Sequence, residues 1–318
     1  MSKASGSSVS KKIKDFVTSL RVSIRLITST TQGKIGFTIV LGAVLLSILA
    51  PLFPYPGVAM QNLVYEDALP SIHPSFWYIL GGDYNGAPFL LDIIYGLQYF
   101  MIVGVVAAAI TVSIGVVLGV ISGYVGGYVD QALNFVFSLL LTIPSFALWL
   151  VLAVIFRNAG PITLGFILGI LSWGGLARAI RSVALSNKAK DFVEASRALG
   201  LSSWSIISND ILPGIMPYVF MNFMLAINNG IYGSMGLALL GLLPFTAINW
   251  GIDMNIAIYR QGAVYNFNST IPLIIITIIS TLLLMGFVFL ANASDRVFDP
   301  QKRKEAENVL ASKKIRNS

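Results

Sequence analysis

The sequence contains no cysteine and only one histidine, His73. The absence of cysteine excludes disulfides, thiolate catalysis and Cys-ligated zinc, and one histidine argues against a His-built metal site, so we expect His73 to be an ordinary loop residue. Charged residues are also scarce, at 11% of the 318 positions, whereas hydrophobic residues make up 56% and the mean hydropathy is +0.79. Such a chain is too apolar for a soluble globular domain, and the expected solvent is the lipid bilayer.

Six apolar segments dominate the sequence, and each is of about the length that a helix needs to cross the hydrocarbon core. We therefore predict an all-α integral membrane protein with six transmembrane helices, at residues 35–53, 93–124, 131–156, 161–183, 216–242 and 271–291. Pro144 predicts a kink in the third span. Gly115, Gly119 and Gly123 are spaced four apart in the second span and predict close contact with a neighbouring helix.

The spans divide the chain into four regions. Residues 1–34 are predicted to be a tail with an interfacial amphipathic helix, and a solvated basic tail is the alternative. Residues 35–92 hold the first span and an irregular loop. Residues 93–291 hold five spans, a polar loop at 184–213 and a loop at 243–270, and residues 292–318 form a second tail.

Positive charge is distributed unequally between the two sides of the predicted spans. The two tails, together with the far end of the fourth span and the 184–213 loop, carry 19 Lys and Arg, and the opposite side carries only Arg157 and Arg260. By the positive-inside rule this places both termini and the 184–213 loop in the cytoplasm, with Arg178 and Arg181 as anchors near the headgroups. Because topology explains the net charge of +7, nucleic acid is not an expected partner.

The sequence lacks the groups that would let the chain energise transport itself. No acidic residue lies between the ends of the six predicted spans, and no Gly-x-x-x-x-Gly-Lys-Ser/Thr loop is present to bind ATP phosphates. No nucleophile, acid–base pair or metal cluster sits at a membrane boundary, so we expect no catalytic residue, metal or cofactor in this chain. A secondary carrier or channel and a membrane enzyme are the disfavoured alternatives, and uphill transport would need energy from another chain.

Residues 184–213 are the clearest amphiphilic stretch between two apolar blocks. The apolar positions of a first short helix share one face: Phe192, Ala195 and Leu199. Glu194 can pair with Arg197 three residues on, and Gly200 stands where helices commonly end in a left-handed residue.

A second short helix is predicted from Trp204 to Leu212, with Ser202 or Ser203 as its cap. Pro213 and Pro217 are then expected to redirect the chain into the fifth span. The pattern predicts a compact helical knob, and an ordinary loop lying on the membrane is the alternative.

Motifs in and around this loop resemble a known family. Glu194-Ala195-Ser196, Gly200 and Ile211-Leu212-Pro213 resemble the EAA loop of permease subunits in binding-protein-dependent ABC importers. Further motifs over residues 73–300 resemble the C-type permease of the dipeptide/oligopeptide branch: Ile94-Tyr95-Gly96, Val103-Gly104, Gly123-Tyr124, Gly126 to Asp130, Ile143-Pro144-Ser145, Ala177-Arg178 and Asp299-Pro300. Ser196 replaces the usual second alanine, and the segment from Gly81 to Gly86 lacks the arginine that usually follows it.

The resemblance implies a type I ABC importer permease (MetI-like) fold in the plasma membrane. It also implies a coupling helix that docks on an ATPase, built from Asp191, Glu194, Ala195, Ser196, Ala198, Leu199, Gly200 and Leu201. The implied partners are a B-type permease forming a heterodimer, two ATPase subunits that bind Mg-ATP, and an extracytoplasmic binding protein. The implied cargo is a di- or oligopeptide, with oligosaccharides or nickel as alternatives.

Four polar or aromatic residues leave two interpretations open. Asn222 and Asn229 share one face of the fifth span, where they can line a pathway or form interhelical hydrogen bonds. Trp250 and Tyr259 are expected to be interfacial aromatics or contacts of the binding protein.

Overall fold

The computed structural model describes residues 22–53, 76–83, 88–156, 160–243, 248–265 and 267–294, and within these ranges the named elements are all helical. The only other pairing among them is an isolated bridge between Gly82 and Pro88. Four helical segments are long and apolar enough to cross a membrane, or up to six if each of two bent pairs is one span. The predicted all-α membrane fold is confirmed, and the count of six holds when each bent pair is one span.

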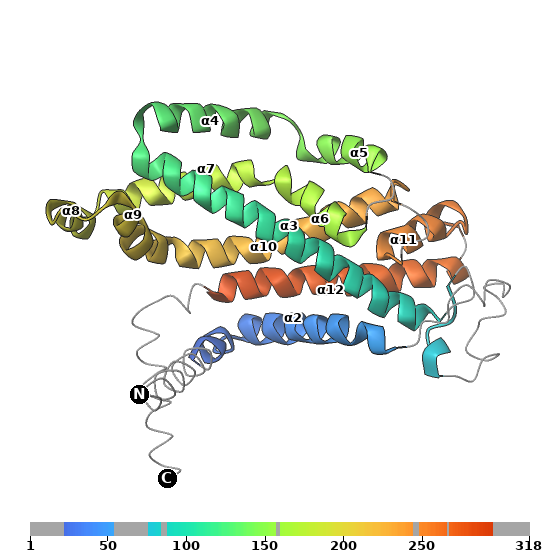
Figure 1. The fold of residues 1–318 in the computed structure, drawn as a ribbon. Helices are drawn as coiled ribbons and strands as arrows, with labels where there is room; N and C mark the ends of the chain where they lie inside the picture. Colours follow the sequence, from blue (N-terminus) through green and yellow to red (C-terminus); the bar gives the residue numbers. More distant parts are fainter. Residues whose placement is uncertain are drawn as a thin grey trace, which may run out of the picture.

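The helices lie roughly along a common direction (Figure 1). The elements are α2 (Thr31–Leu49), η1 (Ala50–Leu52), η4 (Phe76–Tyr78), α3 (Phe89–Val125), α4 (Gly127–Thr142), α5 (Ser145–Ile155), α6 (Pro161–Ile170), α7 (Trp173–Lys188), α8 (Asp191–Ala198), α9 (Ser203–Ile206), the π-helix η5 (Ile207–Ile211), α10 (Leu212–Leu239), α11 (Trp250–Tyr259) and α12 (Phe267–Ser294). The start of α2, the end of α12 and α8 lie at one end of the molecule, which we call the α8 end (Figure 1). The opposite end holds α11 and is called the α11 end.

Helix α3 is the centre of the bundle and packs against α6, α7 and α10. Its 37 residues correspond to about 55 Å, well beyond the roughly 30 Å of a hydrocarbon core. A Cβ added at Gly119 would lie 2.6 Å from the carbonyl oxygen of Ala177, and one at Gly123 would lie 2.6 Å from that of Arg181. The glycine spacing therefore marks a close helix contact, as predicted, and α7 is the partner.

Helix α11 lies inside the segment that the sequence predicts to be a loop, so that prediction is wrong. The side chain of Asn249 caps this helix by accepting a hydrogen bond from the N–H of Gly251 at 2.8 Å. Trp250 is 1% exposed, and its Nε1 donates to the carbonyl of Ile93 at 3.1 Å. Trp250 is thus a core residue that fastens α11 to α3, and neither predicted surface role holds for it, whereas Tyr259 is 68% exposed.

Two predicted spans are broken more sharply than their sequences indicate. Helices α4 and α5 meet at 76° next to Pro144, which is a break rather than a kink. Helices α6 and α7 meet at 51° around Leu171 and Ser172, where no bend is predicted. No proline stands at the second break, and the local signal there is Ser172 followed by Gly174 and Gly175, because helices also bend at serine and glycine.

The fifth span shows the opposite deviation, because its prolines do not redirect the chain. Helical structure is continuous from Ser203 to Leu239. Directly before Pro213 the helix widens into a π turn, in which the N–H of Leu212 bonds to the carbonyl of Ile207. A wider turn accommodates a ring that has no N–H to donate, so the helix passes Pro213 unbroken.

The start of the described chain packs against the bundle. Residues 22–27 are helical, and Val22, Leu26 and Ile27 are buried in the main core cluster. This part of the predicted interfacial helix therefore lies against protein. The predictions for residues 1–21, His73, the segment from Asn85 to Gly86, Arg157 and residues 295–318 lie outside the described residues.

Candidate functional site

Helices α8 and α9 project as a pair from the α8 end (Figure 1). Their base is fixed by Lys188, whose Nζ donates to the carbonyl of Tyr124 at 2.6 Å and lies 5.5 Å from the centre of its ring. Val193 is fully buried and packs with Tyr124 and residues of the neighbouring helices: Ala184, Ile206 and Ile211. We call the segment from Asp191 to Ile206 the knob, and Val193 is the side chain that holds α8 onto the bundle.

The end of α8 has the geometry that Gly200 predicts. Gly200 has φ +79°, a left-handed conformation that costs side-chain-bearing residues energy. The N–H of Leu201 bonds to the carbonyl of Ser196 at 3.2 Å, and the N–H of Gly200 bonds to that of Arg197 at 3.0 Å. These two bonds form a Schellman motif, and Ser202 then caps α9 by accepting from the N–H of Ser205.

The outer surface of the knob is apolar to an extent that is unusual for a projecting element. Leu199 is 80% exposed and Trp204 77%, with Phe192 and Leu201 each about half exposed. Exposed apolar patches of this kind mark contacts with another protein or with membrane. The knob is therefore a surface suited to a partner.

The predicted coupling residues are nearly all on this surface. Ser196 is half-buried. The other seven are exposed: Asp191, Glu194, Ala195, Ala198, Leu199, Gly200 and Leu201. The predicted pair between Glu194 and Arg197 is wrong, because no ion pair joins them. Both side chains are exposed, where pairing contributes little and solvation competes well.

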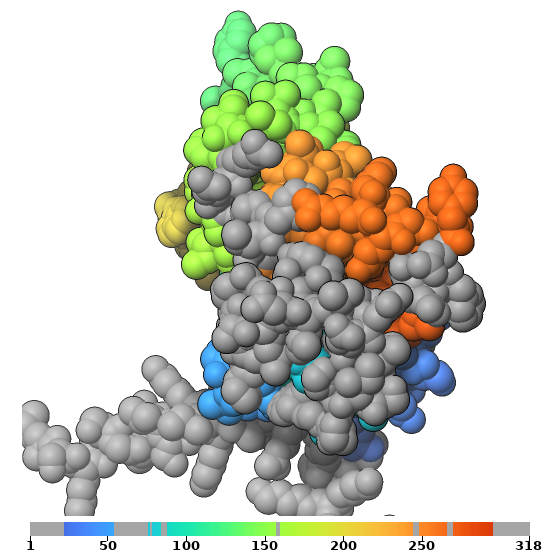
Figure 2. Space-filling model, turned by 90° about the vertical axis from the view of Figure 1, so that its right-hand side faces the viewer, coloured from blue at the N-terminus to red at the C-terminus, as the bar shows by residue number. Residues whose placement is uncertain are grey.

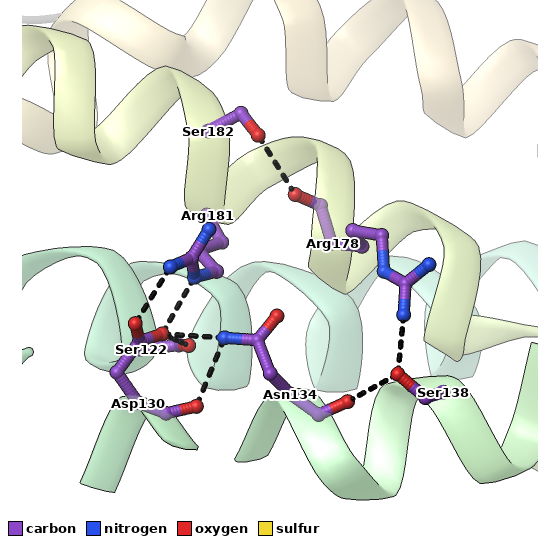
Figure 3. A network of polar contacts seen from close by, with 7 residues as sticks. All are labelled: Ser122, Asp130, Asn134, Ser138, Arg178, Arg181 and Ser182. Carbon is purple, nitrogen blue, oxygen red and sulfur yellow. Dashed lines mark hydrogen bonds and ion pairs between the residues drawn. The ribbon is translucent and has the colours of Figure 1, made fainter. Parts of the chain in front are cut away.

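A polar network joins three helices at the α8 end (Figure 3). Asp130, in the first turn of α4, receives two hydrogen bonds from Arg181 of α7, at 2.5 and 2.6 Å. It also accepts from Ser122 of α3 at 2.5 Å and from Asn134 at 2.6 Å. We call these four residues the clasp.

One further contact extends this connection along α4. Arg178 donates to the hydroxyl of Ser138 at 2.6 Å, and that hydroxyl donates to the carbonyl of Asn134 at 2.8 Å (Figure 3). The sequence predicts Arg178 and Arg181 to be headgroup anchors, whereas the structure directs both into bonds with α4. Helix α4 otherwise has few neighbours, so the clasp is its main polar tie to the bundle.

A cavity of about 270 Å³ lies between α3, α5, α6, α7 and α10. Asn222 and Asn229 both line it, together with Trp149, Ser172 and Tyr218. Neither carboxamide bonds to another helix within the described residues, and the pathway role of the two asparagines stays a prediction. The neighbouring Asn228 does bond to another helix, donating to the carbonyl of Leu284 on α12 at 3.5 Å.

The α11 end carries a smaller acidic site. Asp83 and Asp253 line a cavity of about 20 Å³, large enough for roughly one water molecule. Burial and the charge of Asp83 raise the pKa of Asp253 well above its usual value. In the view onto this end, the orange atoms around α11 lie at the surface beside the green α4 and α5 (Figure 2). No group of three or more potential ligands for a metal occurs among the described residues.

Two acidic residues lie just outside the predicted spans but inside helices of the structure. Asp92 lies in the first turn of α3 and is 2% exposed, and Asp130 lies in the first turn of α4. Both are near helix ends, so the middles of α3 and α4 carry no carboxylate. Sequence reasoning missed their structural roles because the helices begin earlier than the apolar runs.

These features define a multi-pass membrane protein with an exposed apolar knob at one end and a cavity between its helices. The model of the family "Binding-protein-dependent transport system inner membrane component" matches residues 115–304. This covers more than half of the chain, and the protein belongs to that family.

Individual relatives agree with this assignment. The chain is 28% identical to the dipeptide transport system permease protein DppC of Lactococcus lactis over 252 residues, which cover 78% of this chain and 71% of the relative. It is 26% identical to the oligopeptide transport system permease protein OppC of Bacillus subtilis, over 70% of this chain and 72% of the relative. It is 32% identical to OppC of Escherichia coli K12, over 61% and 66%.

Proposed function

We propose that the protein is the C-type permease subunit of an ATP-driven importer and forms half of a translocation pore for di- or oligopeptides. The observation that carries the proposal is the match to binding-protein-dependent permeases over the segment that holds the knob. Peptides are the proposed cargo because the relatives are named as dipeptide and oligopeptide permeases. An exposed apolar knob on a membrane protein without a phosphate-binding loop supports an external motor.

The proposed partners are those implied by the family, and each is placed here on a surface of this chain. Two ATPase subunits hold Mg-ATP, and one of them receives the knob through Glu194, Leu199 and their neighbours. A B-type permease packs beside the cavity and completes the pore. The binding protein delivers its cargo to the α11 end. The excess of Lys and Arg at the α8 end and in both tails supports placing that end in the cytoplasm of a plasma-membrane protein.

In this proposal the chain performs no chemistry and transmits motion. ATP-driven closure of the ATPases displaces α8, and α7 follows because only Ala189 and Lys190 separate the two helices. The clasp makes α4 follow α7, since Arg181 and Asp130 join them by two charge-assisted hydrogen bonds. The helices around the cavity then alternate between facing inward and facing outward.

Reconstitution tests the proposal. The chain is placed in proteoliposomes with its partner permease, ATPases and binding protein, and uptake of labelled peptides is measured with and without ATP. Uptake that needs ATP and every partner supports the proposal. Uptake by this chain alone, without nucleotide, would establish a carrier or channel instead, and uptake of oligosaccharide or nickel in place of peptide would replace the proposed cargo.

A further inference from the structure

Helix α10 presents a polar stripe to the cavity. Tyr218, Asn222, Leu225 and Asn229 all line it, and their spacing of four, three and four residues places them on one helix face. The stripe from Tyr218 to Asn229 extends about 16 Å along the helix. The cavity therefore has one continuous wall on α10.

The carboxamides on this wall retain unused hydrogen-bonding capacity. Nδ2 of Asn222 donates to the carbonyl of Tyr218 at 2.8 Å, while its Oδ1 accepts no hydrogen bond from the described residues. Asn229 is exposed, and its side chain makes no hydrogen bond within the described part of the chain. Asn229 lies about 15 Å from the nearer end of α10, at Leu239. An uncovered carboxamide at that depth is costly against lipid, so this face is suited to a polar occupant.

The rest of the wall is uncharged, and two of its four other polar side chains are already bonded, while Nε1 of Trp149 has no partner among the described residues. Among the described residues, the lining contains no Asp, Glu, Lys or Arg. Thr111 donates to the carbonyl of Gly169, and Ser172 donates to that of Leu168. Trp149 packs so closely on α10 that a Cβ at Gly233 would lie 2.6 Å from its ring. Asn222 and Asn229 are therefore the amide groups that remain available.

We propose that Asn222 and Asn229 form a neutral track that hydrogen-bonds to the backbone of a transported peptide. A carboxamide offers a donor and an acceptor, which are the complement of a peptide group. Their separation of seven positions corresponds to about 10.5 Å along the helix, or roughly three residues of extended peptide. Because the wall is uncharged, it binds the backbone that all peptides have in common and does not select peptides by the charge of their side chains. This inference rests on the proposed importer function.

The absence of cysteine from the chain permits a direct experiment on the assembled transporter. Asn222→Cys and Asn229→Cys are made singly, with Asn228→Cys as the matched control because Asn228 faces α12. Labelling by N-ethylmaleimide is followed in proteoliposomes during ATP turnover, with no solute, with a mixture of uncharged tri- to pentapeptides, or with maltotriose. We expect peptides to slow labelling at positions 222 and 229 by about 3-fold or more and to leave position 228 unchanged.

Each outcome decides between distinct conclusions. Labelling at positions 222 and 229 that peptides do not slow, while the parent transporter still imports peptides, would overturn the track and leave the importer function intact. Protection by maltotriose instead of peptides would overturn the peptide assignment. Failure of the parent transporter to import any peptide with ATP would remove the proposed cargo itself and, with it, the track.

Transport by substituted chains gives a second, independent measurement. Asn229→Leu is expected to lower peptide uptake about 3- to 10-fold, the effect of losing one or two net hydrogen bonds. Asn229→Gln keeps the amide and is expected to retain most uptake. Equal uptake by Asn229→Leu and the parent chain, at equal amounts in the membrane, would contradict the proposal.

Discussion

The clasp allows the energetic tie between α4 and α7 to be measured. Arg181 and Asp130 share two hydrogen bonds, at 2.5 and 2.6 Å, and their side chains are only 27% and 18% exposed. A fully buried pair that loses one partner costs about 3–5 kcal/mol, and an exposed pair is worth at most about 1 kcal/mol. The clasp lies between these cases, so we expect Arg181→Gln to lower the free energy of unfolding by about 2 kcal/mol.

A double-mutant cycle isolates this contribution. Asp130→Asn, Arg181→Gln and the double variant are unfolded in mixed micelles, and the free energies of unfolding are compared. We expect an interaction energy of about 1–3 kcal/mol between the two positions. The matched control is Arg178→Gln, which removes one bond from an exposed arginine and should cost less than about 1 kcal/mol. Additive effects, within about 0.5 kcal/mol, would refute the clasp as a mechanical link.

Two further predictions concern packing and protonation. Gly119→Val should separate α3 from α7 and destabilise the protein by about 3 kcal/mol, as judged by thermal unfolding. The control is Gly42→Val on the open face of α2, which should cost less than about 1 kcal/mol. Equal losses of stability in the two variants would contradict the close contact. Asp253 keeps its proton in the folded state at pH values where the unfolded chain has lost it, because burial and the charge of Asp83 raise its pKa. The Tm of the parent protein should therefore fall relative to that of Asp253→Asn as the pH rises above about 4, and parallel curves would contradict the raised pKa.

The local features of the knob were predictable because they depend on neighbouring residues. Gly200 at a helix end and Ser202 as a cap are short-range signals, and both are confirmed. Phe192 and Leu199 were predicted to share a face, and both are exposed on the knob. Val193, which fixes α8 to the bundle, was missed because its burial depends on Tyr124, far away in the chain.

Other features depend on contacts that no local pattern records. The sequence predicts Trp250 to be an interfacial aromatic because tryptophan is common at membrane interfaces. In the structure its indole packs on Gly96 and donates a hydrogen bond to the carbonyl of Ile93. The sequence predicts Arg181 to be a headgroup anchor because basic residues near the end of a span commonly contact lipid headgroups. Its partner Asp130 lies 51 positions earlier, and only the packing of α4 against α7 brings them together.

Coupling through the knob is the central claim, and the number of peptides imported per ATP hydrolysed tests it most directly. The measurement compares the parent transporter with Glu194→Arg and with Tyr128→Ser, a control at the same end whose side chain is 89% exposed on α4, outside the knob. We predict that Glu194→Arg lowers the ratio at least about 5-fold with unchanged insertion into the membrane, and that Tyr128→Ser leaves it unchanged. An unchanged ratio for Glu194→Arg, or an equal fall for both variants, would contradict the account.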